Sequence, residues 1–137
     1  MASTLKINTL TGVTTAGSIA VTGEGNSTTT NLQQGLNKSW CHWNQDSTQA
    51  SRDSLNIATL TDNGTGDTTF TFTNNMGNAN YAFVGYGSQH IGTNAGFSAY
   101  ETDAQTTSQS NKFRSITVGG AVFDAQSVQA TLNGDLA

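Results

Sequence analysis

The chain has 137 residues, a formal net charge of −4, 34% hydrophobic residues and only 10% charged residues. This length fits one domain with a short extension. The five lysines and arginines form no basic cluster, so the sequence argues against a nucleic-acid-binding protein. No stretch reaches the length of a membrane span, and the start lacks the pattern of a signal peptide, so we expect synthesis in a cytoplasm.

The composition predicts a folded β protein with a thin core. Disordered chains usually combine low hydrophobicity with many prolines or a high net charge, and this chain has no proline and little charge. Its aromatic residues and many threonines favour strands. A thin core leaves stability marginal, and association of identical chains would compensate. The single cysteine, Cys41, excludes an internal disulfide.

Residues 1–36 predict a short stem or docking segment. Apolar and polar residues alternate in LKINTL (5–10) and IAVT (19–22), which predicts two short strands. Residues 23–31 contain no apolar residue and are the best candidate for a linker. One helical turn follows, with Asn31 as its cap and Gly35 at its end.

Residues 37–137 predict an antiparallel β-sandwich of roughly seven strands. Segments with strand patterns recur at the spacing of a sandwich or barrel, and turns rich in Gly, Asn, Asp and Ser separate them. These segments are 39–44, 55–60, 68–73, 80–87, 95–101, 112–119 and 127–132. The polar stretch 45–52 is expected to connect the first two. The predicted fold class is therefore all-β.

The hexapeptide DNGTGD (62–67) is either a metal-binding loop or the turn of a hairpin. Gly64 and Gly66 are able to take positive φ, and the side chains of Asp62 and Asn63 suit a turn entry. A calcium loop needs six or more oxygen ligands, and this segment offers too few. We interpret the hexapeptide as a turn and predict no metal.

Motifs for catalysis or cofactor binding are not found in the sequence. Neither His42 nor His90 has a neighbour at metal-ligand spacing, and no Gly-x-Ser-x-Gly motif is present. The glycines between 85 and 92 precede no helix that would hold a phosphate. Paired carboxylates of the glycosidase type stay open, although most acidic residues stand in turn-like contexts. We therefore predict a protein that is not an enzyme and has no cofactor.

Aromatic side chains in or near loops, with amides and carboxylates nearby, predict a sugar-binding surface. The candidates are Trp43, Tyr81, Tyr86, His90 and Tyr100. We expect Trp40, Phe70, Phe72 and Phe83 to lie in the core, and His42, on the same strand face as Trp40, to lie in the core or an interface. Tyr86, His90 and Tyr100 then form the expected binding surface.

Several stretches resemble virion-associated tail-fibre proteins of tailed bacteriophages, especially marine ones of the cyanophage kind. STLKINTLTGVTTAGSI resembles their N-terminal segment, and residues 31–86 resemble a C-terminal domain that recurs in phage structural proteins. The shared pattern falls at Trp40, Arg52–Ser54, Asp62–Asp67, Met76 and Ala79–Tyr81. The chain departs from it at Gly77, where a proline is common, and at Cys41-His42. Residues 87–137 align with nothing in that family.

The resemblance implies a structural and adhesive role without catalytic residues. It predicts a short homotrimeric tail fibre located in the virion, docked to other proteins of the tail, neck or head, with the β-sandwich facing the host and a host surface glycan as a further partner. Identical chains would meet along residues 1–36. The expected contacts are Leu5, Ile7, Leu10, Ile19 and Val21. The alternatives are a capsid head fibre or decoration protein, and a small glycan depolymerase.

Overall fold

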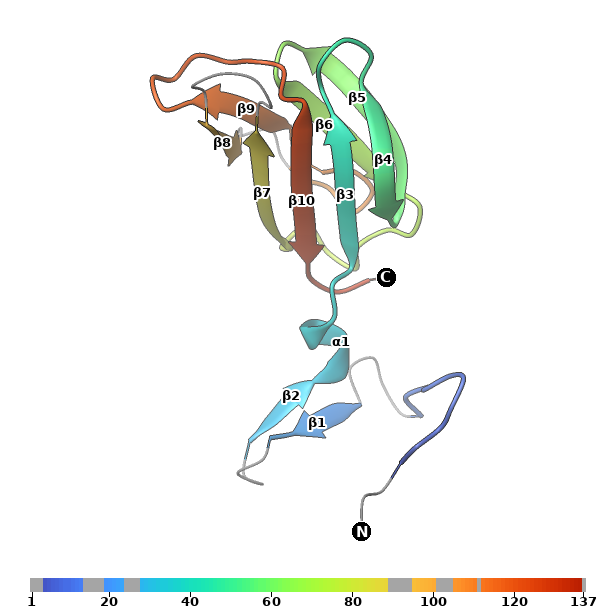
Figure 1. Cartoon of the computed structure of the whole chain (residues 1–137). Helices are drawn as coiled ribbons and strands as arrows, with labels where there is room; N and C mark the ends of the chain where they lie inside the picture. The colour runs from blue at the N-terminus through green and yellow to red at the C-terminus, as the bar shows by residue number, and fades with distance from the viewer. Residues whose placement is uncertain are drawn as a thin grey trace. The chain divides into compact units, whose positions relative to one another are not determined.

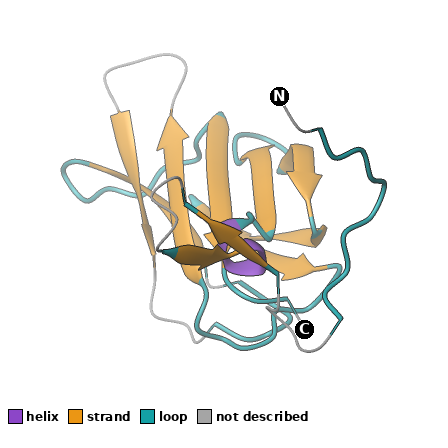
Figure 2. Ribbon diagram, turned by 90° about the horizontal axis from the view of Figure 1, so that it is seen from below, coloured by secondary structure: helices purple, strands orange, loops and turns teal. Residues whose placement is uncertain are grey.

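The computed structural model describes residues 4–13, 19–23, 28–88, 95–100, 105–110 and 112–136, with only the backbone for residues 33–34 and 95–100. The chain divides into two units, residues 1–36 and residues 37–137. Nearly all regular structure in the described residues is strand, and the one helix is a single turn (Figure 2).

The N-terminal unit contains a small hairpin followed by the helical turn. Strands β1 (Ala20–Thr22) and β2 (Thr29–Asn31) pair in antiparallel fashion, and α1 (Leu32–Gly35) follows directly. The Leu32 amide donates a hydrogen bond to the Ile19 carbonyl at 2.8 Å, which ties the start of the helix to the hairpin. The predicted strand at 19–22 and the helical turn ending at Gly35 are confirmed.

Two predictions for the N-terminal unit are wrong. Residues 29–31 form a strand inside the stretch expected to be a linker, because threonines suit a strand once Ala20–Thr22 supplies a partner. Residues 5–10 form no strand, although their side chains alternate. No described segment pairs with them, and an alternating pattern needs a paired neighbour to become a strand.

The C-terminal unit is a sandwich made from one antiparallel sheet. Its strands are β3 (Ser39–Asn44), β4 (Ala50–Leu55), β5 (Ile57–Gly64), β6 (Asp67–Phe72), β7 (Ala82–Ser88), β8 (Ala95–Tyr100), β9 (Phe113–Thr117) and β10 (Ser127–Asn133). Their order is β4-β3-β10-β7-β8-β9-β6-β5. The sheet folds over, so that β4, β3, β10 and β7 form one layer and the other four strands lie behind it (Figure 1). The predicted all-β class is confirmed.

The strand count differs from the expected seven because β4 (Ala50–Leu55) begins inside the stretch 45–52, which was expected to be a connection. Its residues are almost all exposed, since β4 is an edge strand of the sheet. An exposed edge strand needs no apolar alternation and therefore leaves no pattern in the sequence. The predicted strand 55–60 is also divided at Asn56, which has a φ of 60°. Asn56 Oδ1 accepts the Asn74 amide at 2.7 Å and holds this corner in place.

The core lies between the two layers and is built mainly from aromatic rings. Trp43 is fully buried and packs edge-on against Phe70 at 5.3 Å and Phe113 at 5.0 Å between ring centroids. Phe83 completes this cluster at 5.5 Å from Phe113. The predicted burial of Phe70 and Phe72 is confirmed, and Phe83 packs against the core while partly buried.

Three other aromatic residues lie on the opposite side of the sheet from the one expected, or deeper in the core. Trp40 points away from the core, whereas Trp43, expected on the surface, is central to it. Tyr81 is also buried, because its ring packs against Phe72 and its hydroxyl donates to the Gln109 carbonyl at 2.8 Å.

The hexapeptide 62–67 is a hairpin turn, as predicted, but a tighter one. Strands β5 and β6 continue to the pair Gly64 and Asp67, with a bulge between Asp62 and Gly64. Gly64 and Gly66 have φ values of 116° and 73°. The carboxylate of Asp62 accepts the Gly64 amide at 2.9 Å, and that of Asp67 binds Arg114 through two hydrogen bonds of 2.6 Å. Both carboxylates are thus engaged in the fold.

Candidate functional site

The outer surface of β3, β10 and β7 carries the candidate site. Ser39, Cys41 and Trp43 of β3 are buried, so Trp40 and His42 point outward. The same alternation leaves Gln129 and Thr131 of β10 on the outside, between buried Val128, Ala130 and Leu132. On β7, Val84 and Tyr86 are exposed. We call this surface the outer face and define it by Trp40, His42, Val84, Tyr86, Gln129 and Thr131.

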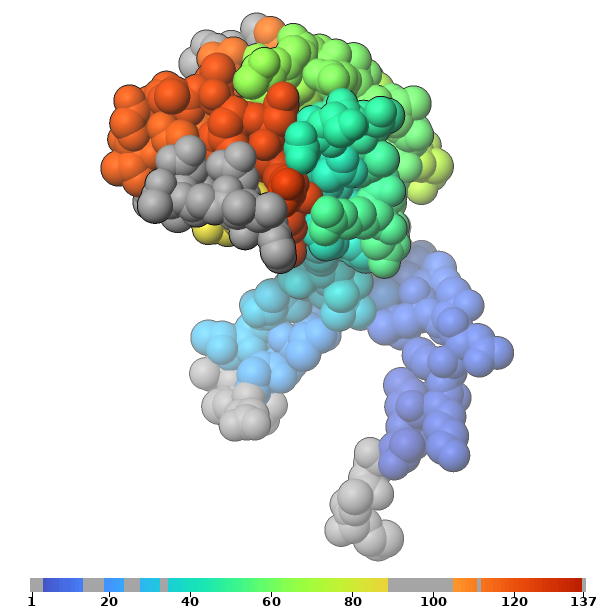
Figure 3. Space-filling view, turned by 45° about the horizontal axis from the view of Figure 1, so that its top comes forward, coloured from blue at the N-terminus to red at the C-terminus, as the bar shows by residue number. Residues whose placement is uncertain are grey.

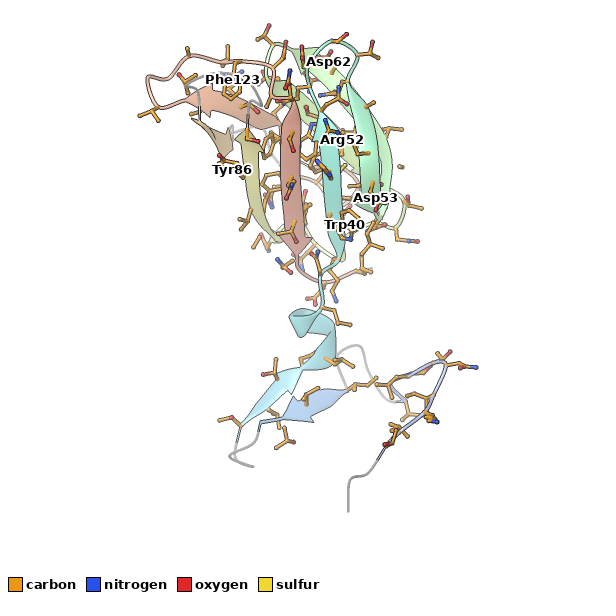
Figure 4. All side chains as sticks on the ribbon, viewed as in Figure 1. Trp40, Arg52, Asp53, Asp62, Tyr86 and Phe123 are labelled. Atoms are coloured by element: carbon orange, nitrogen blue, oxygen red, sulfur yellow. The ribbon has the colours of Figure 1, made fainter. Side chains whose placement is uncertain are left out.

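Strand register arranges the outer face in two rows. His42, Gln129 and Tyr86 lie side by side across β3, β10 and β7. Trp40, Thr131 and Val84 form the next row. Together the six side chains line an open depression of about 530 Å³. Figure 4 shows Trp40 and Tyr86 on the same layer of the sandwich, on either side of β10.

The two large aromatics stand apart from each other. β3 and β7 are separated by β10, which places them about 10 Å apart across the sheet. Tyr86 is 51% exposed and Trp40 is half-buried, so both side chains are in part accessible from the outer face. In the space-filling view, β3 (teal) and β10 (red) lie side by side on this layer (Figure 3). The arrangement offers two separated aromatic platforms with hydrogen-bonding groups between them.

Two polar side chains, Ser127 and Arg52, contact His42 at the end of the first row. The His42 Nε2 atom is 3.1 Å from the Ser127 hydroxyl and 3.4 Å from Arg52 Nη1. A guanidinium only donates, so His42 Nε2 would be the acceptor in a hydrogen bond between these two groups. The second guanidinium nitrogen, Nη2, donates to the Gln126 carbonyl at 2.7 Å.

A β-bulge brings Arg52 to this place. Asp53 pairs with His42 and Ser51 pairs with Trp43, so Arg52 is the extra residue of β4 at this point. A bulge re-aims the side chain of its extra residue, and here the guanidinium reaches His42 on the neighbouring strand. Arg52 and Asp53, both labelled in Figure 4, follow each other on the edge strand.

Cys41 is part of the lining of the depression. Its thiol is not a reactive group of the candidate site. The residue is only 1% exposed, and its sulfur lies 3.6 Å from the Ser51 hydroxyl. Burial raises the pKa of the Cys41 thiol above its ordinary value. A buried thiol with a raised pKa is a poor nucleophile and a poor metal ligand at neutral pH.

The expected site residues are only partly placed by the structure. Tyr86 lies on the outer face, as described above. His90 lies outside the described residues, and Tyr100 ends β8 with its side chain outside them too. The grouping of the three residues into one surface therefore stays a prediction.

Sequence reasoning missed Trp40, Arg52, Gln129 and Thr131 as site residues. The alternation in SWCHWN placed Trp40 and His42 on one side of the strand, but a tryptophan stands on each side. The sequence alone therefore gave no means to choose the outer side. The position of Arg52 was not predictable from the sequence, because it depends on a bulge in β4.

The chain matches no protein-family model, no curated protein and no solved structure. Within the described residues, no helix is long and apolar enough to cross a membrane. The same residues contain no group of three or more His, Cys, Asp and Glu side chains that could hold a metal ion.

Proposed function

We propose that the chain is a structural protein of a tailed bacteriophage virion, a short homotrimeric fibre that attaches to host surface glycans through the outer face. The observation that carries this proposal is the pair of separated aromatic platforms, Trp40 and Tyr86, with polar side chains between them. Aromatic rings stack on the apolar faces of sugars, while amides and hydroxyls bind sugar hydroxyl groups.

The exposed apolar residues of the N-terminal unit support the structural part of the proposal. Leu5 is 78% exposed and Val13 is 98% exposed, and Ile7, Leu10 and Val21 are about half exposed. A stable monomer gains nothing from so many exposed apolar side chains in one short segment, whereas a docking or assembly segment would bury them. Their partners would be copies of this chain and other virion proteins of the tail, neck or head.

Adsorption to the host tests the attachment role. We expect Trp40→Ala and Tyr86→Ala each to reduce binding of the purified protein to host cells at least fivefold while the melting temperature stays within a few degrees. The matched control is Val122→Ala, which truncates an exposed apolar side chain outside the outer face. Normal binding by both aromatic variants would refute attachment through this face.

Labelled antibody on intact particles tests the location in the virion. Labelling of the tail or neck supports a tail fibre, whereas labelling of the head would identify a head fibre or decoration protein. Incubation with host polysaccharide tests the non-catalytic role, and we expect no new reducing ends. Release of reducing ends would make the protein a depolymerase.

A further inference from the structure

We infer that the outer face binds an acidic glycan, with a sugar carboxylate on Arg52 and the sugar rings over the row from His42 to Tyr86. This inference rests on the proposed attachment role and names the chemical class of its ligand. Two observations support it. The Arg52 guanidinium is held in place without a described carboxylate partner, and it lies at one end of that row.

Arg52 is held in position but is not neutralised. Its Nη2 donates to the Gln126 carbonyl and its Nη1 contacts His42, so two contacts fix the guanidinium plane. No described carboxylate lies within ion-pair distance of it. The other arginine shows the contrast, since Arg114 is already bound by both carboxylate oxygens of Asp67. A guanidinium carries five donors in a fixed plane, so Arg52 retains donors for an incoming carboxylate.

Hydrogen-bonding groups continue from Arg52 along the first row. The His42 ring contacts the guanidinium, and the Ser127 hydroxyl lies 3.1 Å from the same His42 Nε2 atom. Gln129 follows on β10, and Tyr86 closes the row on β7. A glycan lying across the strands would place its carboxylate at Arg52, its hydroxyls over Gln129 and an apolar ring face on Tyr86. Trp40 is two residues along β3 from His42, which places it about 7 Å from the row. There it would contact the side of the bound glycan.

Asp53 opposes the binding of an anion and so gives the inference a test by charge. It lies directly across from His42 on β4, and its carboxylate accepts the Ser54 amide at 2.8 Å. A carboxylate near the bound anion weakens binding through like-charge repulsion. Removing the Asp53 charge should therefore strengthen binding of an acidic glycan, and removing the Arg52 charge should weaken it. A neutral glycan would respond to neither change in this way.

The experiment compares acidic oligosaccharides with their methyl esters by isothermal titration calorimetry. The probes are oligogalacturonate, oligomannuronate and sialyllactose, each beside its neutral ester, with the intact chain at low salt. We expect at least one acid to bind about tenfold or more tightly than its ester, because the ester cannot form a charge-assisted hydrogen bond with the guanidinium. The difference should shrink at high salt, since exposed charges are screened.

Variants then assign the preference to Arg52. We expect Arg52→Gln to remove the preference for the acid, Arg52→Lys to restore part of it, and Asp53→Asn to strengthen binding of the acid about two- to fivefold. Lys6→Gln is the control, since it makes the same change in net charge in the N-terminal unit. The melting temperature of each variant checks that the fold is intact.

Two failures can be told apart. If no acid binds more tightly than its ester, or if Arg52→Gln keeps the preference, the acidic-glycan inference is wrong. If Trp40→Ala and Tyr86→Ala still reduce adsorption to host cells in that case, the attachment role stands with a neutral ligand. If adsorption is also unchanged, the proposed function fails as well.

Discussion

The indole Nε1 of Trp43 donates a hydrogen bond to the Thr68 hydroxyl at 3.1 Å, inside the core and between the two layers of the sandwich. Both residues are fully buried. The same hydroxyl accepts a hydrogen bond from Gln45 Nε2, also at 3.1 Å, and the carbonyl oxygen of that amide in turn accepts the Ser115 hydroxyl at 2.6 Å. The largest core side chain is thus oriented by a polar network that joins β3, β6 and β9.

Thr68→Val tests the contribution of this network to stability. Valine fills the same volume but leaves the buried indole N–H without an acceptor. We expect the free energy of unfolding to fall by about 1–3 kcal/mol, the cost of an unsatisfied buried donor. Urea denaturation followed by tryptophan fluorescence measures it. Thr61→Val, on the exposed side of β5, is the control and should change stability little. A Thr68→Val protein as stable as the parent would show that the network contributes nothing.

The turn between β5 and β6 makes different demands on its two glycines. A Cβ at Gly66 would lie 2.8 Å from the Phe123 carbonyl oxygen, whereas a Cβ at Gly64 meets nothing within 4 Å. Both have positive φ. We expect Gly64→Ala to cost about 1–2 kcal/mol through backbone strain alone. Gly66→Ala should cost clearly more, because it also displaces a neighbouring backbone. Thermal denaturation of both variants compares them, and equal losses would contradict the predicted clash.

The hairpin was predictable because each part of its pattern is local. Alternation in 55–60 and 68–73 sets the two strands, and the glycines between them allow the positive φ that a tight turn requires. The length of the turn was not predictable, since the bulge at Asn63 follows from pairing across the strands. Local patterns therefore gave the element and its type, and pairing decided its boundaries.

The sequence alone did not determine which face of β3 points into the core. Trp40 and Trp43 have similar intrinsic preferences, and the choice between them depends on Phe70 and Phe113, which are distant in the sequence. The candidate site depends on that choice, because burial of Trp43 exposes Trp40 and His42. β4 and the Arg52 bulge likewise depend on long-range pairing with β3. Only Tyr86 of the outer face was expected from the sequence.

Cys41 should be unreactive in the folded protein. Burial raises the pKa of its thiol, so the thiol is protonated at neutral pH. We expect reaction with a disulfide reagent such as DTNB to be slow at pH 7.5 and to become rapid and stoichiometric in denaturant. Fast reaction of the native protein would show that the sulfur is accessible and would contradict its burial.

The same raised pKa links the stability of the fold to alkaline pH. The folded state disfavours the thiolate, so the stabilisation is fully present below the ordinary pKa of the thiol, 9.0, and is lost as pH rises through the higher folded value. We expect the parent to lose more stability above pH 9 than Cys41→Ala does, as measured by urea denaturation across pH 7–11. Parallel pH curves for the two proteins would contradict this linkage.

The N-terminal unit is where assembly is expected. The described part of its hairpin buries little, and Leu5, Ile7, Leu10 and Val21 are each at least 50% exposed, while Ile19 is partly buried. In the described part of the chain, β1 and β2 form a sheet of two strands and pair with no third strand. Closed rotational symmetry would bury these side chains and cover both edges at once. We propose three-fold symmetry because phage fibres commonly have it and a phage fibre is the function that we propose for this chain.

Light scattering of the purified protein tests this assembly. We expect a mass about three times that of the 14.3 kDa chain at micromolar concentration and neutral pH. Deletion of residues 1–30 should leave the sandwich folded and shift the mass towards one chain, because it removes the exposed apolar residues of the stem. Leu5→Ser combined with Ile7→Ser should weaken the assembly, whereas Val118→Ser, which alters an equally exposed side chain in the C-terminal unit, should not. A parent protein with the mass of one chain would refute the trimer. A trimer that survives the deletion would move the interface to the sandwich.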